Sequence, residues 1–237
     1  MEEVQRQRVV AYQPGDQARA LLSETKMVLM VGMSGVGRDT IINELVRRGA
    51  YYPLVTSTTR LPRVNDGIME QNGVEYYFLT PDQATHNLEQ GGYVEVSPVH
   101  DHVNGLLIEE LQRAHDSGKI AISDVDPQGA MKYRQLSDTV TAIFVLPPSY
   151  EEWMRRNKQR YASDDEFTAA WPRRRQSAMM ELNMAIHAPF YHFVINDQVT
   201  HAVDACDAIA HGAPLDQAAQ EKGIALARAI LASLQAE

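Results

Sequence analysis

The chain has 237 residues, of which 44% are hydrophobic and 22% charged, and a formal net charge of −9 at pH 7. This composition is typical of a folded protein with a substantial core, and the acidic balance argues against general affinity for nucleic acids or anionic membranes. The single cysteine, Cys206, excludes an internal disulfide framework. No apolar run approaches the roughly 20 residues that span a bilayer, and the N-terminus lacks the apolar core of a secretion signal. We therefore expect a cytoplasmic protein without nucleic-acid or membrane partners, whose oligomeric state the sequence leaves unknown.

A glycine-rich segment, Gly32–Thr40, follows the apolar run Met27–Val31 and precedes the helical pattern Thr40–Val46. Strand, glycine-rich turn and helix in this order are typical of a nucleotide phosphate-binding loop, because successive backbone N–H groups and the helix N-terminus attract anions. The usual pattern is G-x-x-x-x-G-K-[ST], and this chain has Arg38 and Asp39 in place of the lysine and the hydroxyl residue. The alternative is a glycine-rich turn that binds no ligand. The residues predicted to bind the nucleotide cofactor here are Gly32, Ser34, Gly35, Val36, Gly37, Arg38, Asp39 and Thr40.

Further β-rich runs alternate with helical patterns along the chain. The predicted strands after Met27–Val31 are Tyr93–Val96, Ile120–Ile122, Val140–Val145 and Phe193–Ile195. Between them, Gly105–His115 has apolar residues spaced for one helical face. Strands separated by helices predict a parallel sheet covered on both faces, with ligands at the carboxyl ends of its strands.

Two segments depart from this alternation. Residues 56–103 mix short strands, turns and one short helix after Pro81, which predicts an inserted substrate module. The segment Arg155–Arg175 is rich in arginine and is interrupted by Ser163-Asp164-Asp165, which predicts a mobile flap. The alanine-rich pattern Pro214–Gln235 predicts a helix packed on the surface of the domain.

A second group of phosphate-binding side chains is predicted within the inserted module. Arg60 and Arg63 are three residues apart, with Pro62 between them, and Tyr76 follows. Two guanidinium groups and a phenol are able to converge on one phosphate, and arginine contacts phosphate oxygens in a bidentate manner. The alternative is a solvated loop that happens to carry arginines.

The order of these motifs resembles the guanylate kinase family from about Met27 to Asp197. The motifs that carry the resemblance are Thr56–Arg63, Asn72–Tyr76, Tyr93–Glu95, Ser123–Gly129, Pro147–Ser149 and Val194–Asp197. The resemblance implies an α/β P-loop fold of three layers, with a parallel sheet core, an inserted GMP-binding module and an arginine-bearing lid. We expect a guanylate-kinase-like domain at 26–211, an N-terminal extension at 1–25 and a C-terminal helical extension at 212–237.

The resemblance also implies transfer of the γ-phosphoryl group of ATP to GMP or dGMP, with Mg²⁺. The implied substrate-binding residues are Thr56, Arg60, Arg63, Glu70, Tyr76, Glu95, Asp124 and Asp126. A carboxylate suits guanine, because it accepts hydrogen bonds from both N1–H and the 2-amino group. Glu95 is alternatively an exposed strand carboxylate, and Asp126 also suits a helix N-cap with Pro127 at the first helical position, a role compatible with guanine binding.

Phosphoryl transfer requires alignment and cations where charge develops. The implied catalytic residues are Arg38, Arg156, Arg160 and Arg174. Arg156 and Arg160 are four residues apart, which predicts one helical face. Asn196 joins the cofactor-binding set, and Asp39 and Asp124 are candidate ligands of Mg²⁺.

Two further departures from the family pattern affect the acceptor. Asn104 and Leu106 stand where the family has a tyrosine and a hydroxyl residue, and Val64–Met69 lengthens the arginine loop. Together with the altered phosphate loop, these departures leave two alternatives. One is a kinase for a different phosphorylated small molecule, and the other is a catalytically weak binding or scaffold protein.

Overall fold

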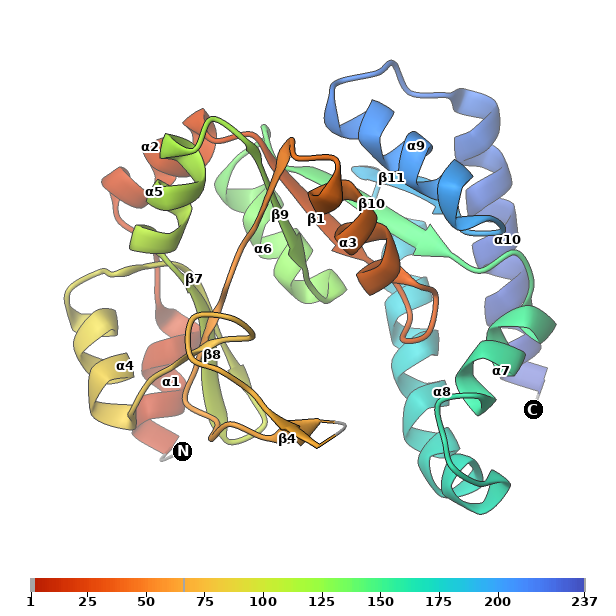
Figure 1. Cartoon of the computed structure of the whole chain (residues 1–237), viewed down its shortest axis with the longest axis horizontal. Helices are drawn as coiled ribbons and strands as arrows, with labels where there is room; N and C mark the ends of the chain where they lie inside the picture. Colours follow the sequence, from red (N-terminus) through yellow and green to blue (C-terminus); the bar gives the residue numbers. More distant parts are fainter. Residues whose placement is uncertain (1–2, 66, 237) are drawn as a thin grey trace. The chain divides into compact units, whose positions relative to one another are not determined.

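The computed structural model describes residues 3–65 and 67–236, and Figure 1 shows its elements. The chain divides into two compact units. Unit 1 comprises Met1–Met27, Tyr51–Ser123 and Met131–Val140, and unit 2 comprises Val28–Ala50, Asp124–Ala130 and Thr141–Glu237.

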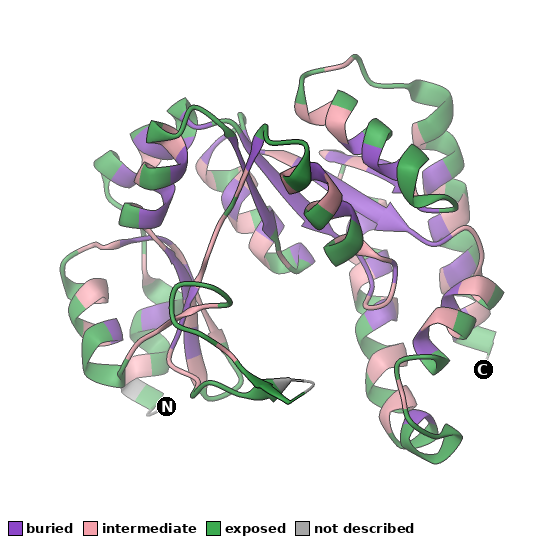
Figure 2. Ribbon diagram, in the orientation of Figure 1, coloured by how far each residue is buried: buried purple, intermediate pink, exposed green. Residues whose placement is uncertain are grey.

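Five strands form the central sheet in the order β11-β10-β1-β9-β2. Their bounds are β1 (Met27–Val31), β2 (Tyr51–Pro53), β9 (Ile120–Asp124), β10 (Thr141–Leu146) and β11 (Tyr191–Ile195). The pairs β1–β10, β10–β11 and β2–β9 are parallel. Every residue of β1 is buried, which Figure 2 shows as a purple strand. Continuous burial explains why this strand is apolar throughout instead of alternating with polar residues.

Among the described residues, five helices accompany the strands of unit 2, and two of them begin at serine caps. They are α3 (Arg38–Arg47), α7 (Tyr150–Lys158), α8 (Asp164–His187), α9 (Val199–Ala210) and α10 (Gln217–Ala236). Ser149 and Ser163 cap α7 and α8, because each hydroxyl accepts a hydrogen bond from a backbone N–H three residues later. The helix α9 packs on α3, and α10 packs on α8 and β11. Cys206 lies in α9 and is buried.

Unit 1 contains a second sheet with the strand order β6-β3-β8-β7. Its strands are β3 (Ser57–Thr58), β6 (Tyr77–Phe78), β7 (Tyr93–Val99) and β8 (His102–Leu107), and a separate hairpin joins β4 (Val64–Asn65) to β5 (Ile68–Met69). The accompanying helices are α1 (Glu3–Ala11), α2 (Asp16–Glu24), α4 (Pro81–Glu89) and α5 (Ile108–Asp116), and α6 spans Pro127–Leu136. In α4, Thr80 and Gln83 form a reciprocal capping box with Pro81 at the helix start.

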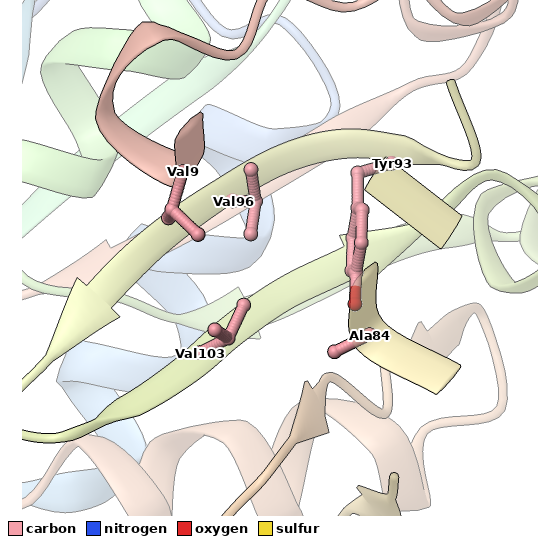
Figure 3. Packing of buried hydrophobic residues seen from close by; sticks show 5 residues of the cluster. All are labelled: Val9, Ala84, Tyr93, Val96 and Val103. Atoms are coloured by element: carbon pink, nitrogen blue, oxygen red, sulfur yellow. The ribbon is translucent and has the colours of Figure 1, made fainter. Parts of the chain in front are cut away.

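A small hydrophobic cluster holds this module together. Val9 of α1 and Ala84 of α4 pack with Tyr93, Val96 and Val103 of the two long strands, as Figure 3 shows. The N-terminal segment therefore contributes directly to the core of unit 1.

Most predicted elements are confirmed, and the differences have physical causes. The run Tyr93–Val96 belongs to the second sheet and not to the parallel one, because β7 pairs antiparallel with β8. The helix expected from Gly105 begins at Ile108, because Gly105 pairs with Ser57 and Val96 inside β8. The helix expected from Pro214 begins at Gln217. Within residues 3–65 and 67–236, no helix combines the length and apolar character needed to cross a membrane.

Candidate active site

The phosphate loop connects β1 to α3 through three glycines with positive φ. These are Gly32 (147°), Gly35 (88°) and Gly37 (95°), and such backbone angles favour glycine strongly. Gly37 is also the N-cap of α3. A Cβ atom added at Gly37 would lie 2.5 Å from Nδ2 of Asn196. The loop conformation therefore depends on glycine both for its backbone angles and for its close contact with Asn196.

Three side chains from distant parts of the sequence hold the loop. Trp153 donates from Nε1 to the carbonyl oxygen of Ser34 at 2.9 Å, and Asn196 donates from Nδ2 to that of Val36 at 2.8 Å. Arg174 donates from Nη1 to Oγ of Ser34 at 2.8 Å. Asn196 and Arg174 were predicted from the sequence, whereas Trp153 was not, because its role has no local signature.

A cavity of about 460 Å³ lies beside the loop. Its lining brings together most of the predicted phosphate-binding residues, namely Ser34, Gly35, Gly37, Arg38, Asp39, Thr40, Asp124, Arg156 and Arg160. The prediction that Arg156 and Arg160 share one helical face is wrong, because α7 ends at Lys158. Both side chains nevertheless line the same cavity, and Nη2 of Arg156 also donates to the carbonyl oxygen of Asn196 at 3.1 Å.

Arg38 points to Asp124 in this structure. Its Nη1 lies 2.9 Å from Oδ1 of Asp124, and the exposed fractions of the two side chains are 18% and 39%. The surrounding protein raises the pKa of Asp124 to about 6 by removing part of its hydration, while Arg38 opposes this and Asp39 and Asp126 add to it. The cavity wall thus combines an arginine with carboxylates that repel one another.

Glu181 belongs to the same electrostatic group. Its Oε2 atom is buried without a hydrogen-bond partner among the described residues. Burial raises its pKa to about 7, Arg38 lowers it, and Asp126 and Asp124 raise it. Glu181 lines a second cavity of about 500 Å³ together with Ser34, Trp153, Asn157, Tyr161, Arg173, Arg174 and other residues of α8. In this cavity the guanidinium of Arg174 lies 5.2 Å from the centre of the Tyr161 ring.

In unit 1, Glu70 holds Arg60 in place. Arg60 donates from Nη1 and Nη2 to the two carboxylate oxygens of Glu70 at 2.8 and 3.0 Å, and the hydrogen bonds to Glu70 raise the pKa of Arg60. The guanidinium also lies 5.2 Å from the ring centre of Tyr76. The backbone N–H of Arg63 donates to the same carboxylate at 2.8 Å, while Arg63 itself is exposed. These contacts fix the guanidinium of Arg60, and Arg63 lies at the edge of the same group of residues.

Glu95 forms an ion pair with a lysine that the sequence analysis missed. Nζ of Lys132 donates to Oε1 of Glu95 at 2.9 Å, to the carbonyl oxygen of Val96 at 3.1 Å and to Oγ of Ser97 at 2.6 Å. Oγ of Ser97 also donates to Oε1 of Glu95. Both partners therefore contact the same oxygen of Glu95, which fixes the carboxylate.

The remaining predicted residues have clear local surroundings. Thr56 is half-buried, and its carbonyl oxygen accepts a hydrogen bond from the N–H of Tyr77. Asp126 caps α6, because Oδ1 accepts from the N–H of Gly129 at 2.7 Å, which confirms the predicted helix cap. Asn104, one of the departures from the family pattern, accepts through Oδ1 from Oγ1 of Thr58 at 2.8 Å.

Comparisons with known proteins agree with the resemblance seen in the sequence. Residues 24–213 match the family model described as guanylate kinase. The chain is 31% identical over 184 residues to the guanylate kinase of Caldanaerobacter subterraneus, covering 77% of this chain and 85% of that protein. It is 32% identical over 190 residues to the guanylate kinase of Chromohalobacter salexigens, covering 80% of this chain and 84% of that protein. Guanylate kinase 1 of Oryza sativa is 33% identical over 181 residues, which are 73% of this chain and 44% of that protein.

The crystal structure of guanylate kinase from Anaplasma phagocytophilum has the same fold. It superposes with a TM-score of 0.57 at 22% identity, covering 82% of this chain and 88% of that one. The family model alone spans well over half of the sequence and includes the phosphate loop, residues 56–103 and the helices α7 and α8. The chain belongs to the guanylate kinase family.

Proposed function

We propose that this protein transfers the γ-phosphoryl group of ATP to GMP or dGMP and releases ADP and GDP or dGDP. The observation that carries the proposal is the cavity beside the phosphate loop, with Arg38, Arg156 and Arg160 in its lining. Charge spreads over the oxygens of the transferred group in the transition state, so that positioned cations and backbone N–H groups lower the barrier. Arg174, bound to Ser34 of the loop, adds a fourth cation.

Mg²⁺ fits the carboxylates of the cavity. Asp39 and Asp124 both line it, and Mg²⁺ bound with a nucleotide needs one or two carboxylates, since phosphates and waters complete its octahedron. When bound, the ion would neutralise negative charge on the phosphates of the nucleotide. Asp39 and Asp124 would hold the ion, and Arg38, whose Nη1 lies 2.9 Å from Oδ1 of Asp124, would use its other N–H groups to contact the phosphates.

The acceptor is bound by the residues of unit 1. Arg60, Arg63 and Tyr76 contact the phosphate of GMP, and Glu70 preorganises Arg60 through its bidentate ion pair. Thr56 and Glu95 of this unit face the guanine. Adenine has no N1–H and no 2-amino group, so a fixed carboxylate at Glu95 favours guanine.

The test is a coupled assay of ADP formation with Mg·ATP and GMP, dGMP, AMP, CMP, UMP or no acceptor. Rapid turnover with GMP or dGMP supports the proposal. In Arg60→Ala the KM for GMP should rise about 10- to 100-fold, the factor expected when a charged hydrogen bond is lost. Arg8→Ala, which removes an exposed arginine of the same unit, should leave the KM unchanged.

Two results would replace the proposal by its alternatives. Turnover only with another phosphorylated acceptor would identify a kinase of different specificity. Failure to turn over any acceptor, with GMP still bound in calorimetry, would identify a binding protein of this fold.

A further inference from the structure

Two neighbouring arginines of α8 contact different elements. Arg174 donates to Oγ of Ser34 in the phosphate loop, and Arg175 donates from Nε to the carbonyl oxygen of Leu234 in α10 at 2.8 Å. Consecutive residues of an α-helix point about 100° apart, so that one turn of α8 contacts the loop on one side and α10 on another. The helix α10 lies beyond residues 24–213, which match the family model.

Arg175 contacts a carbonyl group in the last turn of α10. Leu234 belongs to the last turn of α10, where carbonyl groups have no intrahelical partner and carry partial negative charge. A guanidinium satisfies such a carbonyl and interacts favourably with the helix dipole. Arg175 is half-buried, which shields this interaction from solvent.

The helix α10 is itself fixed to unit 2 by close packing. Its buried residues Gly223, Ala227, Ile230 and Leu234 form one face, and α10 packs on α8 and β11. A Cβ atom at Gly223 would lie 2.3 Å from Cβ of Phe193. The close approach of helix and strand therefore requires glycine at this position.

A glutamine of α10 also covers the outer edge of the sheet. Gln220 accepts through Oε1 from the N–H of Phe193 at 3.0 Å and donates from Nε2 to the carbonyl oxygen of Tyr191 at 2.6 Å. Because β11 is an edge strand, this amide takes the place of a neighbouring strand. The orientation of α10 is thus set by specific hydrogen bonds as well as by apolar contact.

Pro172 lies inside α8, shortly before the two arginines. A proline inside a helix removes one backbone hydrogen bond and weakens the helix at that point. Arg174 and Arg175 follow Pro172 within one turn of the helix, and Arg175 contacts α10 through Leu234.

We propose that α10 positions Arg174, the arginine of α8 that contacts the phosphate loop. By binding Arg175 and packing on α8, α10 keeps Arg174 at the loop. Arg175 is a positioning residue that acts through Arg174. The proposal rests on the proposed phosphoryl transfer, in which Arg174 contacts the phosphates.

Steady-state kinetics of matched variants test the proposal. Arg175→Ala should lower kcat about 10- to 100-fold, the cost of misplacing a catalytic group, with the KM for GMP changed less than about twofold. Arg175→Lys, which keeps a donor, should restore most of kcat, and Gly223→Ala should lower kcat by moving α10. Arg228→Ala removes an exposed arginine from the same helix and should match the wild type.

Tryptophan fluorescence supplies a readout that is independent of turnover. The chain has two tryptophans, Trp153 and Trp171, whose ring centres lie 5.6 Å apart, and Trp153 binds the phosphate loop. The emission change on adding ATP should therefore differ from that of the wild type in Arg175→Ala and not in Arg228→Ala.

An Arg175→Ala variant with wild-type kcat and a wild-type fluorescence response to ATP would overturn the proposal. Equal losses of kcat in Arg175→Ala and Arg228→Ala would overturn it as well. If the wild-type protein shows no GMP-dependent turnover, the proposed function fails, while the fluorescence comparison still decides whether α10 controls the geometry at the loop.

Discussion

Replacing Glu181 by glutamine should stabilise the protein at pH 8 and leave its stability nearly unchanged at pH 4.5. The carboxyl group has a buried oxygen without a hydrogen-bond partner among the described residues. Burial, together with the charges of Asp126 and Asp124, raises its pKa from 4.5 to about 7, and Arg38 only partly offsets this. The folded protein therefore holds a proton on Glu181 over a range of pH in which the unfolded chain has lost it.

The sign follows from proton linkage. Between about pH 4.5 and pH 7 the folded state binds more protons at Glu181 than the unfolded state, so that the free energy of unfolding falls as pH rises and becomes level above pH 7. A difference between 4.5 and about 7 corresponds to about 3 kcal/mol at 1.36 kcal/mol for each pKa unit. Water that reaches this half-buried side chain reduces the value to about 2 kcal/mol. Glutamine carries no charge and avoids the loss.

Urea unfolding of the wild type and Glu181→Gln at pH 5, 6, 7 and 8 measures the effect. The difference in unfolding free energy should grow with pH in favour of the variant and reach about 2 kcal/mol at pH 8. Glu151→Gln is the control, because hydrogen bonds lower the pKa of this exposed carboxyl and it is ionised in both states above pH 5. The difference in unfolding free energy between Glu151→Gln and the wild type should stay constant over the same pH range. A constant difference for Glu181→Gln as well would refute the reasoning.

Three further outcomes are expected. Gly37→Ala should lower the free energy of unfolding by about 2 kcal/mol and weaken ATP binding in calorimetry. Gly37 has a φ of 95°, and an added Cβ would lie 2.5 Å from Asn196. Gly49→Ala is the control, because Gly49 has a φ of 88° but no neighbour within 4 Å of an added Cβ; it should lower the free energy of unfolding less and bind ATP normally. Lys132→Met should raise the KM for GMP several-fold with kcat nearly unchanged, because Glu95 loses the lysine that fixes it; an unchanged KM would remove Glu95 from the guanine site. Burial raises the pKa of the Cys206 thiol to about 12, so iodoacetamide at pH 8 should alkylate it only after unfolding, and fast labelling of the native protein would contradict this.

The phosphate loop was predictable because its requirements are local. Positive φ angles at Gly35 and Gly37 demand glycine whatever the rest of the chain does, and the apolar run of β1 directly before them marks a strand buried on both faces. The short helix expected after Pro81 is likewise confirmed as α4, whereas Ser163-Asp164-Asp165, interpreted as an interruption of a flap, is the capped start of α8. Such features depend on backbone chemistry within one or two turns of chain.

Contacts between distant residues were not predictable in this way. Lys132 meets Glu95 and Trp153 meets Ser34 across 37 and 119 positions of sequence, and no local pattern marks either partner. The helix expected from Gly105 is present as α5, but it begins at Ile108 for a related reason. Its apolar spacing continues into β8, where pairing with β3 and β7 prevails over helical periodicity.

The arginine in the phosphate loop is best understood through its partner. Arg38 contacts Asp124 through Nη1, and a guanidinium has further N–H donors that a lysine in the same place lacks. Arginine is therefore able to contact the carboxylate and phosphate oxygens together, whereas lysine has only a compact ammonium group. We expect Arg38→Lys to lower kcat about tenfold, the loss of one charged hydrogen bond, with a smaller change in the KM for GMP. A rise in kcat would contradict this argument, because it would show that arginine limits turnover in a loop better suited to lysine.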